Sequence, residues 1–250
     1  MKLKLISWNC NKNFRNKYKV VEYFEPDIVI VPESESTEYL LEKAKPEFWD
    51  HFDKECHQWI GEKNPYHGLG VFTRNGFRVK RLNEYEPEYL LIDALSIFYK
   101  DTFCFNLFPV WAKKYCKNGD YGYIVNVIKA IRGYSNIIND KTIFAGDFNG
   151  GLAYEKNGQD YRNFNKFLLE MSKIDFKSGY HSTKNEKFGK EKLYTHKKKS
   201  SHKDFHIDYI WLHQKQIPNI HEFKIISFDE IKKIFGVSSD HSLIYMMIDF

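Results

Sequence analysis

The stretch Lys141-Thr142-Ile143-Phe144-Ala145-Gly146-Asp147-Phe148-Asn149-Gly150 decides the fold. Residues 141–144 are predicted to form a buried strand, which stops at the polar and turn-forming residues 146–150. Asp147 and Asn149 therefore stand just beyond the tip of a predicted strand. Gly-Asp-x-Asn-Gly is also favourable turn chemistry, so this segment alone indicates a turn and a functional site about equally.

Other short stretches have the same character, because an apolar strand delivers one or two polar residues at its end. They are Ser7-Trp8-Asn9, Val31-Pro32-Glu33, His206-Ile207-Asp208-Tyr209 and Ser239-Asp240-His241-Ser242. Each has an ordinary alternative: a surface carboxylate at Glu33, a solvent-facing Asp208, or a local pair at His241. Folds that combine helices and sheets place ligands at strand ends, so the set as a whole indicates a site.

These residue types match the chemistry of phosphate-ester hydrolysis. Carboxylate and amide oxygens are the ligands that a hard divalent cation prefers. A carboxylate can activate water, and a histidine oriented by an aspartate can move a proton or stabilise charge on a phosphoryl oxygen. An asparagine amide can hold a phosphate by hydrogen bonding.

Short apolar runs alternate with helical patterns, which predicts an α/β architecture. With no linker and no repeat, residues 1–250 are expected to form one domain. Strands are expected at residues 3–8, 28–31, 70–73, 77–81, 91–98, 102–108, 141–144, 206–212 and 242–248. Helices are expected at residues 18–24, 37–45, 121–134 and 161–171.

The composition is that of a soluble globular protein, with 42% hydrophobic and 28% charged residues. No membrane span and no signal peptide are expected, which favours the cytoplasm. The cysteines are scattered, so neither a zinc cluster nor a disulfide framework is expected. A net charge of +5 permits a polyanionic partner, and nothing indicates an obligate protein partner.

In chain order, a series of motifs resembles those of the endonuclease/exonuclease/phosphatase superfamily, which includes DNase I-like nucleases. The motifs are Trp8-Asn9, Pro26-Asp27-Ile28-Val29-Ile30-Val31-Pro32-Glu33, Gly68-Leu69-Gly70-Val71-Phe72, Gly146-Asp147-Phe148-Asn149, His206-Ile207-Asp208-Tyr209 and Ser239-Asp240-His241. The resemblance runs from residue 7 to the C-terminus. It implies a four-layer α/β/β/α sandwich with the site at one end of the two sheets.

The resemblance also implies roles at a Mg²⁺ (or Mn²⁺) site. Glu33 would be the main metal carboxylate, Asn9 would lie beside the metal, and Asp240 would be a further carboxylate on the metal side. One ion would polarise the phosphoryl group, and whether a second joins it is left open.

The remaining motif residues would carry the reaction. Asp147 would orient or activate water, and Asn149 would hold the phosphate. His241 would contact the scissile phosphate, and Asp208 would orient that histidine, as in many hydrolases.

One position departs from the pattern, because many relatives carry a phosphate-binding His or Tyr where the strand at residues 102–108 ends. Phe108 is the nearest match and cannot donate a hydrogen bond. The contact is either dispensable, or lost with much of the activity, or supplied by another residue. Candidates for replacement are Tyr66, His67, Tyr115 and His181. We favour His67, in a loop just before a strand, although an ordinary surface histidine fits equally well.

The substrate is less well defined than the chemistry. A basic segment at residues 196–203, with Lys197, Lys198 and Lys199, precedes the Asp208 strand and favours nucleic acid at one rim of the site. A second basic stretch, at residues 12–19, is a candidate for the opposite rim. Both are also consistent with solvated surface. Alternatives are a phosphatase acting on a small metabolite or lipid headgroup, and a catalytically impaired nucleic-acid-binding protein. DNA and RNA are not distinguished, nor is internal from terminal cleavage.

Overall fold

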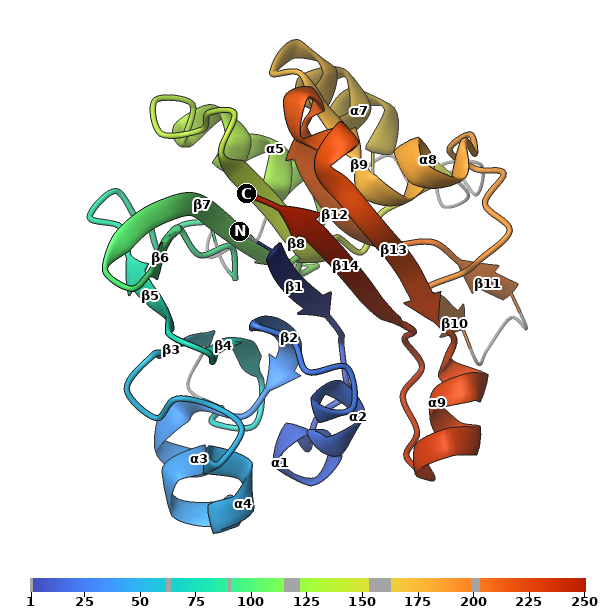
Figure 1. The fold of residues 1–250 in the computed structure, drawn as a ribbon. Coiled ribbons are helices and arrows are strands. Elements are labelled where there is room, and N and C mark those ends of the chain that lie inside the picture. The colour runs from blue at the N-terminus through green and yellow to red at the C-terminus, as the bar shows by residue number, and fades with distance from the viewer. Residues whose placement is uncertain (1, 62–63, 90, 115–121, 153–162, 199–202) are drawn as a thin grey trace.

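The computed structural model describes residues 2–61, 64–89, 91–114, 122–152, 163–198 and 203–250. Two six-stranded sheets lie face to face, and helices cover their outer faces (Figure 1). The predicted α/β/β/α sandwich is therefore confirmed. None of the described helices is long and apolar enough to span a membrane.

In the first sheet, the first and last strands of the chain are neighbours and neither is an edge strand. The order of this sheet is β13 (Ile220–Ile226), β14 (Leu243–Asp249), β1 (Lys2–Ser7), β2 (Ile28–Ser34), β4 (Gly68–Thr73) and β3 (His57–Gly61). Only the β1–β2 pair is parallel, and the other neighbours are antiparallel.

The second sheet carries the stretch that decided the fold. Its order is β5 (Phe77–Arg81), β6 (Leu95–Tyr99), β7 (Thr102–Trp111), β8 (Thr142–Asp147), β12 (Asp208–His213) and β9 (Phe176–Ser178). β7 and β8 run parallel, so their carboxyl ends meet at the same edge. A separate two-stranded ribbon joins β10 (His196–Lys198) to β11 (Lys203–Phe205).

The helices divide between the two outer faces (Figure 1). Those packed with the first sheet are α1 (Phe14–Lys17), α2 (Lys19–Glu22), α3 (Thr37–Lys43), α4 (Pro46–Trp49) and α9 (Phe228–Phe235). Those packed with the second are α5 (Ile124–Gly133) and α7 (Phe164–Lys173). The short α8 (Gly179–Lys184) and the 3-10 helix η2 (Gln214–Asn219) complete the described helices.

The core has a layer between the sheets and a layer beneath each set of helices. Leu5, Ile30, Ile143 and Ile210 belong to the layer between the sheets and are fully buried. Burying such a side chain stabilises the fold by roughly 1.5–3 kcal/mol. The strand tips thus rest on a packed interior, which keeps the polar residues beyond them in place.

Most predicted elements are present, but several boundaries were wrong. The strand expected at residues 102–108 continues to Trp111, and the one expected at 91–98 is confined to β6. The helix expected at 18–24 is replaced by α1 and α2. Strands β3 and β13 and helix α9 were not predicted. Residue 121, the expected start of another helix, lies outside the described residues.

Candidate active site

The register of the second sheet brings strand tips together at one edge. Asp147, the last residue of β8, pairs with Asp208 at the start of β12 and with Trp111 at the end of β7. Asn9 follows β1 in the other sheet, and its Nδ2 donates to Asp147 Oδ2 (3.1 Å) and to Glu33 Oε1 (3.2 Å). The ends of both sheets therefore meet at a single polar cluster.

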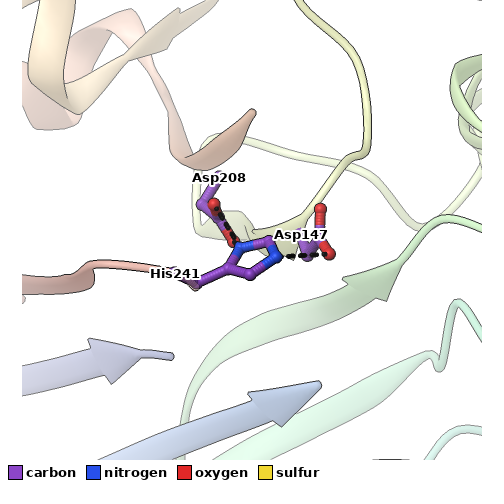
Figure 2. A group of neighbouring side chains, drawn as sticks. All are labelled: Asp147, Asp208 and His241. Carbon is purple, nitrogen blue, oxygen red and sulfur yellow. Dashed lines mark hydrogen bonds and ion pairs between the residues drawn. The ribbon is translucent and has the colours of Figure 1, made fainter. Parts of the chain in front are cut away.

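His241 lies between two aspartates in this cluster (Figure 2). Its Nδ1 donates to Asp208 Oδ2 at 2.9 Å, and its Nε2 lies 3.9 Å from Asp147 Oδ2. All three side chains are buried, so Asp208 does not face solvent. Burial opposes protonation of His241, but Asp208 and Asp147 outweigh it and raise the pKa of the imidazole to about 10. The ring is therefore cationic near neutral pH.

The Asp147 carboxylate is held by hydrogen bonds from two asparagines, Asn9 and Asn149. Besides Asn9, it accepts from the Asn149 backbone N–H (2.9 Å) and from Asn149 Nδ2 (3.0 Å). Burial, and then the charge of Asp208, raise the pKa of Asp147 to about 7. The turn interpretation of the segment is confirmed, since the backbone contact from Asn149 is an Asx turn built on Asp147, the candidate site residue.

The Asn149 amide nitrogen is engaged within the protein. The two N–H bonds of Nδ2 are directed at Asp147 Oδ2 and at Ala112 O (3.1 Å). This arrangement positions Asp147, and the phosphate contact that the resemblance implied for Asn149 stays a prediction.

The glycine that precedes this aspartate is required by close packing. Gly146 has φ +144°, and a Cβ there would lie 1.9 Å from Val110 O on the neighbouring strand. No side chain fits between β7 and β8 at this point.

Glu33 projects from an irregularity in β2. The pairing of β2 with β4 shifts between Pro32 and Ser34, and Glu33 itself has φ +63°. Such a bulge redirects a side chain at a sheet end. The Glu33 side chain stays 20% exposed, so solvent reaches this carboxylate more readily than those of Asp147 and Asp208.

His67, the favoured candidate for the missing contact, is in the cluster. Its Nε2 lies 3.5 Å from Glu33 Oε2, and its ring packs edge-on against Trp111 with centroids 5.2 Å apart. Nε2 is buried and has no hydrogen-bond partner among the described residues. Burial lowers the pKa of His67; Glu33 opposes this, and Lys113 and Lys12 add to it.

Phe108 is not the residue at the strand tip, contrary to the sequence-based interpretation. It is fully buried and stacks on Phe144 with centroids 4.9 Å apart, under the α5 layer. The predicted strand ended before Pro109, whereas β7 continues through it. The residue opposite Asp147 is Trp111, and Lys113 Nζ lies 4.0 Å from its ring centroid. Sequence reasoning assigned no role to either residue.

His181 is not brought into the cluster. Its Nδ1 lies 2.9 Å from Ser178 Oγ, its Nε2 lies 3.1 Å from Glu191 Oε1, and its ring stacks on Phe188 at 3.6 Å. Both ring nitrogens have partners and the side chain is buried. The structure gives no support for substrate binding by His181, and its contacts are those of a core histidine.

The remaining candidates lie around His241. Asp240 Oδ1 accepts from Asn11 Nδ2 (3.1 Å), and the Asp240 carbonyl accepts from the Lys197 N–H (2.8 Å). The Lys197 ammonium faces α9, 3.8 Å from Asp229 Oδ1. The ribbon thus borders the site as expected, but this lysine points away from the cluster. Lys198 belongs to β10.

Lys199 and Tyr115 lie outside the described residues, so the structure does not place them.

Thr195 links the backbones that carry Asp208 and His241, although sequence reasoning did not identify it. Its hydroxyl accepts from the N–H groups of Ile207 (2.9 Å) and Asp208 (3.0 Å). Its carbonyl accepts from the N–H of Ser242 (2.7 Å), and the residue is fully buried.

We expect Thr195→Val to lower the free energy of unfolding by about 1–3 kcal/mol per orphaned N–H, because both donors lose their acceptor in a buried place. Urea unfolding measures the loss. Thr195→Ser keeps the hydroxyl and should retain most of the stability. Equal destabilisation by both variants would contradict the assignment, because Thr195→Ser keeps the hydroxyl that accepts the two hydrogen bonds.

His206, the first residue of the His206-Ile207-Asp208-Tyr209 motif, packs in the protein interior. Its Nδ1 donates to Leu193 O (2.9 Å), and its ring lies 4.6 Å from that of Tyr180. Burial lowers the pKa of the imidazole from 6.5 to about 4. The folded protein therefore holds this ring neutral where the unfolded chain takes up a proton.

A consequence is acid sensitivity. Above the unfolded pKa of about 6.5, the ring is neutral in both states and costs no stability. As the pH falls towards about 4, the unfolded chain binds a proton that the folded protein does not, and the free energy of unfolding decreases by about 3 kcal/mol in total. Unfolding of the wild type should therefore depend more steeply on pH between 6.5 and 4 than that of His206→Asn. Parallel pH profiles for the two proteins would contradict the assignment.

No protein-family model and no curated protein matches the sequence. Solved structures do match. An AP endonuclease from Archaeoglobus fulgidus shares 13% identity over 99% of this chain and 100% of that one, with a TM-score of 0.71. NExo, a 3'-5' exonuclease from Neisseria meningitidis, shares 13% over 99% and 100%, with a TM-score of 0.68. D. rerio TDP2 in complex with a single-strand DNA product shares 17% over 100% and 99%, with a TM-score of 0.61.

Identities this low establish the fold alone. The chain has the DNase I-like fold, as the order and spacing of its motifs predicted.

Proposed function

We propose that the protein is a divalent-metal-dependent phosphodiesterase that hydrolyses nucleic acid. The observation that carries the proposal is the buried row Asp208–His241–Asp147, set beside the partly exposed carboxylate of Glu33. The DNase I-like fold and structural neighbours named as endonuclease and exonuclease support the same reading.

The donor set is suited to a metal ion at Glu33. The ligand atoms of Asp147, Asp208 and His241 lie within 4.8 Å of one another, but a cationic His241 has no lone pair to offer an ion. Glu33 has no such obstacle, and His67 Nε2, which has no hydrogen-bond partner among the described residues, lies 3.5 Å from Glu33 Oε2. Glu33 would therefore hold Mg²⁺ or Mn²⁺, and a nitrogen ligand from His67 suits Mn²⁺ better than Mg²⁺.

Asn9 would act beside the metal. Its Oδ1 accepts from the Asn11 N–H (3.0 Å), so its Nδ2 is turned towards the two carboxylates and fixes their positions. Asp240 would contribute charge from the Asn11 side. A bound ion would polarise the phosphoryl group and offset its developing negative charge.

The chain's own residues would carry the proton and the charge. Cationic His241, oriented through Nδ1 by Asp208, directs its Nε2–H into the site, where it would donate to a phosphoryl oxygen. Asp147, whose pKa is raised to about 7, is suited to accept a proton from the attacking water. Asn9 and Asn149 hold that carboxylate in place.

Cations near the cluster fit a phosphodiester backbone. Lys12 and Lys113 lie close enough to His67 to affect its pKa, on the Glu33 side of the site. The β10–β11 ribbon borders the His241 side. Binding through these groups would weaken as salt rises, because neutralised phosphates release counterions.

The deciding experiment offers the protein four labelled substrates with Mg²⁺ or Mn²⁺: single- and double-stranded DNA, and the same forms of RNA. EDTA and Asp147→Asn serve as controls. Cleavage that both controls abolish supports the proposal, and product lengths separate internal from terminal attack. If no polymer is cut while the preparation releases phosphate from a small metabolite or lipid headgroup, the nuclease assignment is wrong.

A further inference from the structure

An outward-facing pair of tyrosines lies next to the Glu33 side of the site. The Tyr66 side chain is 49% exposed, and its ring centroid is 4.8 Å from that of Tyr39 at an interplanar angle of 73°. The loop that carries Tyr66 is tied down, since its N–H donates to Asn64 Oδ1 (3.0 Å) and Pro65 O accepts from the Ser36 N–H (2.7 Å). A large aromatic ring is thus held in solvent at a defined place.

The chain links this ring directly to the reaction centre. Tyr66 immediately precedes His67, whose Nε2 lies 3.5 Å from Glu33 Oε2. The same short loop before β4 therefore brings His67 to Glu33 and exposes the Tyr66 ring to solvent beside the site.

Charge around the pair favours a neutral, flat group. Arg15 lies 5.1 Å from the Tyr39 ring centroid, but its charge is matched by an ion pair with the buried Glu35. Lys43 also lies near both tyrosines, and its charge is matched by Glu42. The cations that bear on His67 are instead Lys113, seated on Trp111, and Lys12. Phosphate is thus favoured at the His67 end, and an uncharged ring at the tyrosine end.

We infer that Tyr66, supported by Tyr39, stacks on an unpaired nucleobase beside the scissile phosphate. The inference rests on the proposed nuclease function and refines its substrate to a strand whose bases are not stacked within a duplex. Aromatic side chains bind single strands in this way because every base has a π-face, so the contact is tolerant of sequence.

The test compares Tyr66→Ala and Tyr66→Phe on single-stranded oligonucleotides. One substrate carries a base at every position. Of the two others, one lacks the base on the 5' side of the cleaved bond and the other lacks the base on its 3' side. Binding is measured by fluorescence anisotropy in EDTA, and cleavage as kcat/KM with Mn²⁺. Tyr23→Ala is the matched control, because Tyr23 is 67% exposed and packs against Phe235, away from the site.

We expect Tyr66→Ala to weaken binding and kcat/KM on the fully based substrate by about tenfold, the scale of one base stacked on one ring. The loss should largely vanish on one of the two base-less substrates. Tyr66→Phe and Tyr23→Ala should behave as wild type, and Tyr66→Ala should lose less on duplex than on single strand.

Two outcomes overturn the inference: no loss in Tyr66→Ala, or the same loss whether or not the base is present. Failure of the proposed function looks different. In that case the wild type binds and cuts none of the oligonucleotides, even though it hydrolyses a small phosphodiester such as bis(p-nitrophenyl) phosphate.

Discussion

His241→Gln is expected to slow cleavage by about 10²- to 10⁴-fold while leaving metal affinity nearly unchanged. The variant keeps a polar side chain but loses the cation whose Nε2 points into the site. Losses of this size follow removal of a proton-transfer or charge-stabilising group. Single-turnover cleavage with Mn²⁺ measures the rate, and calorimetric titration measures the metal affinity.

A second variant tests whether Asp208 acts through His241. Asp208→Asn removes the charge that, with Asp147, raises the pKa of the ring. Asp208→Asn should slow cleavage by a similar factor. The double variant should cleave little more slowly than either single variant, because the effects of residues that act as a unit are not additive.

His221 supplies the matched control for this pair. It lies on the surface with Nε2 2.6 Å from Asp249 Oδ2, so His221→Gln breaks a histidine–aspartate contact far from the cluster. Its cleavage rate should equal that of wild type. The roles are assigned wrongly if the reductions in cleavage rate of Asp208→Asn and His241→Gln add up in the double variant. They are also wrong if metal affinity falls as much as the cleavage rate.

Residues at strand tips were predictable because apolar periodicity and chain order locate them without knowledge of packing. Asp147, Asp208 and Glu33 all follow or begin short apolar strands, and the sheet register brings the two aspartates opposite each other. The same logic placed His67 correctly, since a loop directly before β4 must lie at that sheet edge.

Position along the sequence could not reveal which hydrogen-bond partner each polar side chain has in the folded protein. Asn149 has the residue type of a phosphate ligand, yet its amide is directed at Asp147 and Ala112. His181 was a candidate for the missing phosphate contact, but Glu191 and Ser178 engage its two ring nitrogens. Such assignments depend on contacts between segments, which local pattern does not encode.

Strand ends were the other weak point. A proline normally argues against a strand interior, because it lacks an N–H for the ladder. In β7, however, Pro109 is paired with Ala145 in the parallel ladder, and the strand continues to Trp111. Ending the strand too early placed its tip at Phe108, three positions before Trp111, and left Lys113 beyond it without an assigned role.

The metal assignment has its sharpest test in Glu33→Gln. Glu33 and Asp147 share the Nδ2 of Asn9, so two carboxylates face the same amide nitrogen. Removing one charge relieves their repulsion. We therefore expect the metal-free variant to be at least as stable as wild type, which separates loss of the metal from loss of the fold.

Wild type should melt at a higher temperature as Mg²⁺ or Mn²⁺ is added, because an ion that binds only the folded state stabilises it by about 2.7 kcal/mol at 100 times its Kd. Glu33→Gln should show little of this rise, whereas His241→Gln should keep it. Glu38→Gln, on the exposed face of α3, is the matched control and should respond as wild type.

If Glu33→Gln retains the full metal response while Asp147→Asn loses it, the ion lies among Asp147, Asp208 and His241. In that case His241 must give up its proton to bind the ion, and Glu33 has another role.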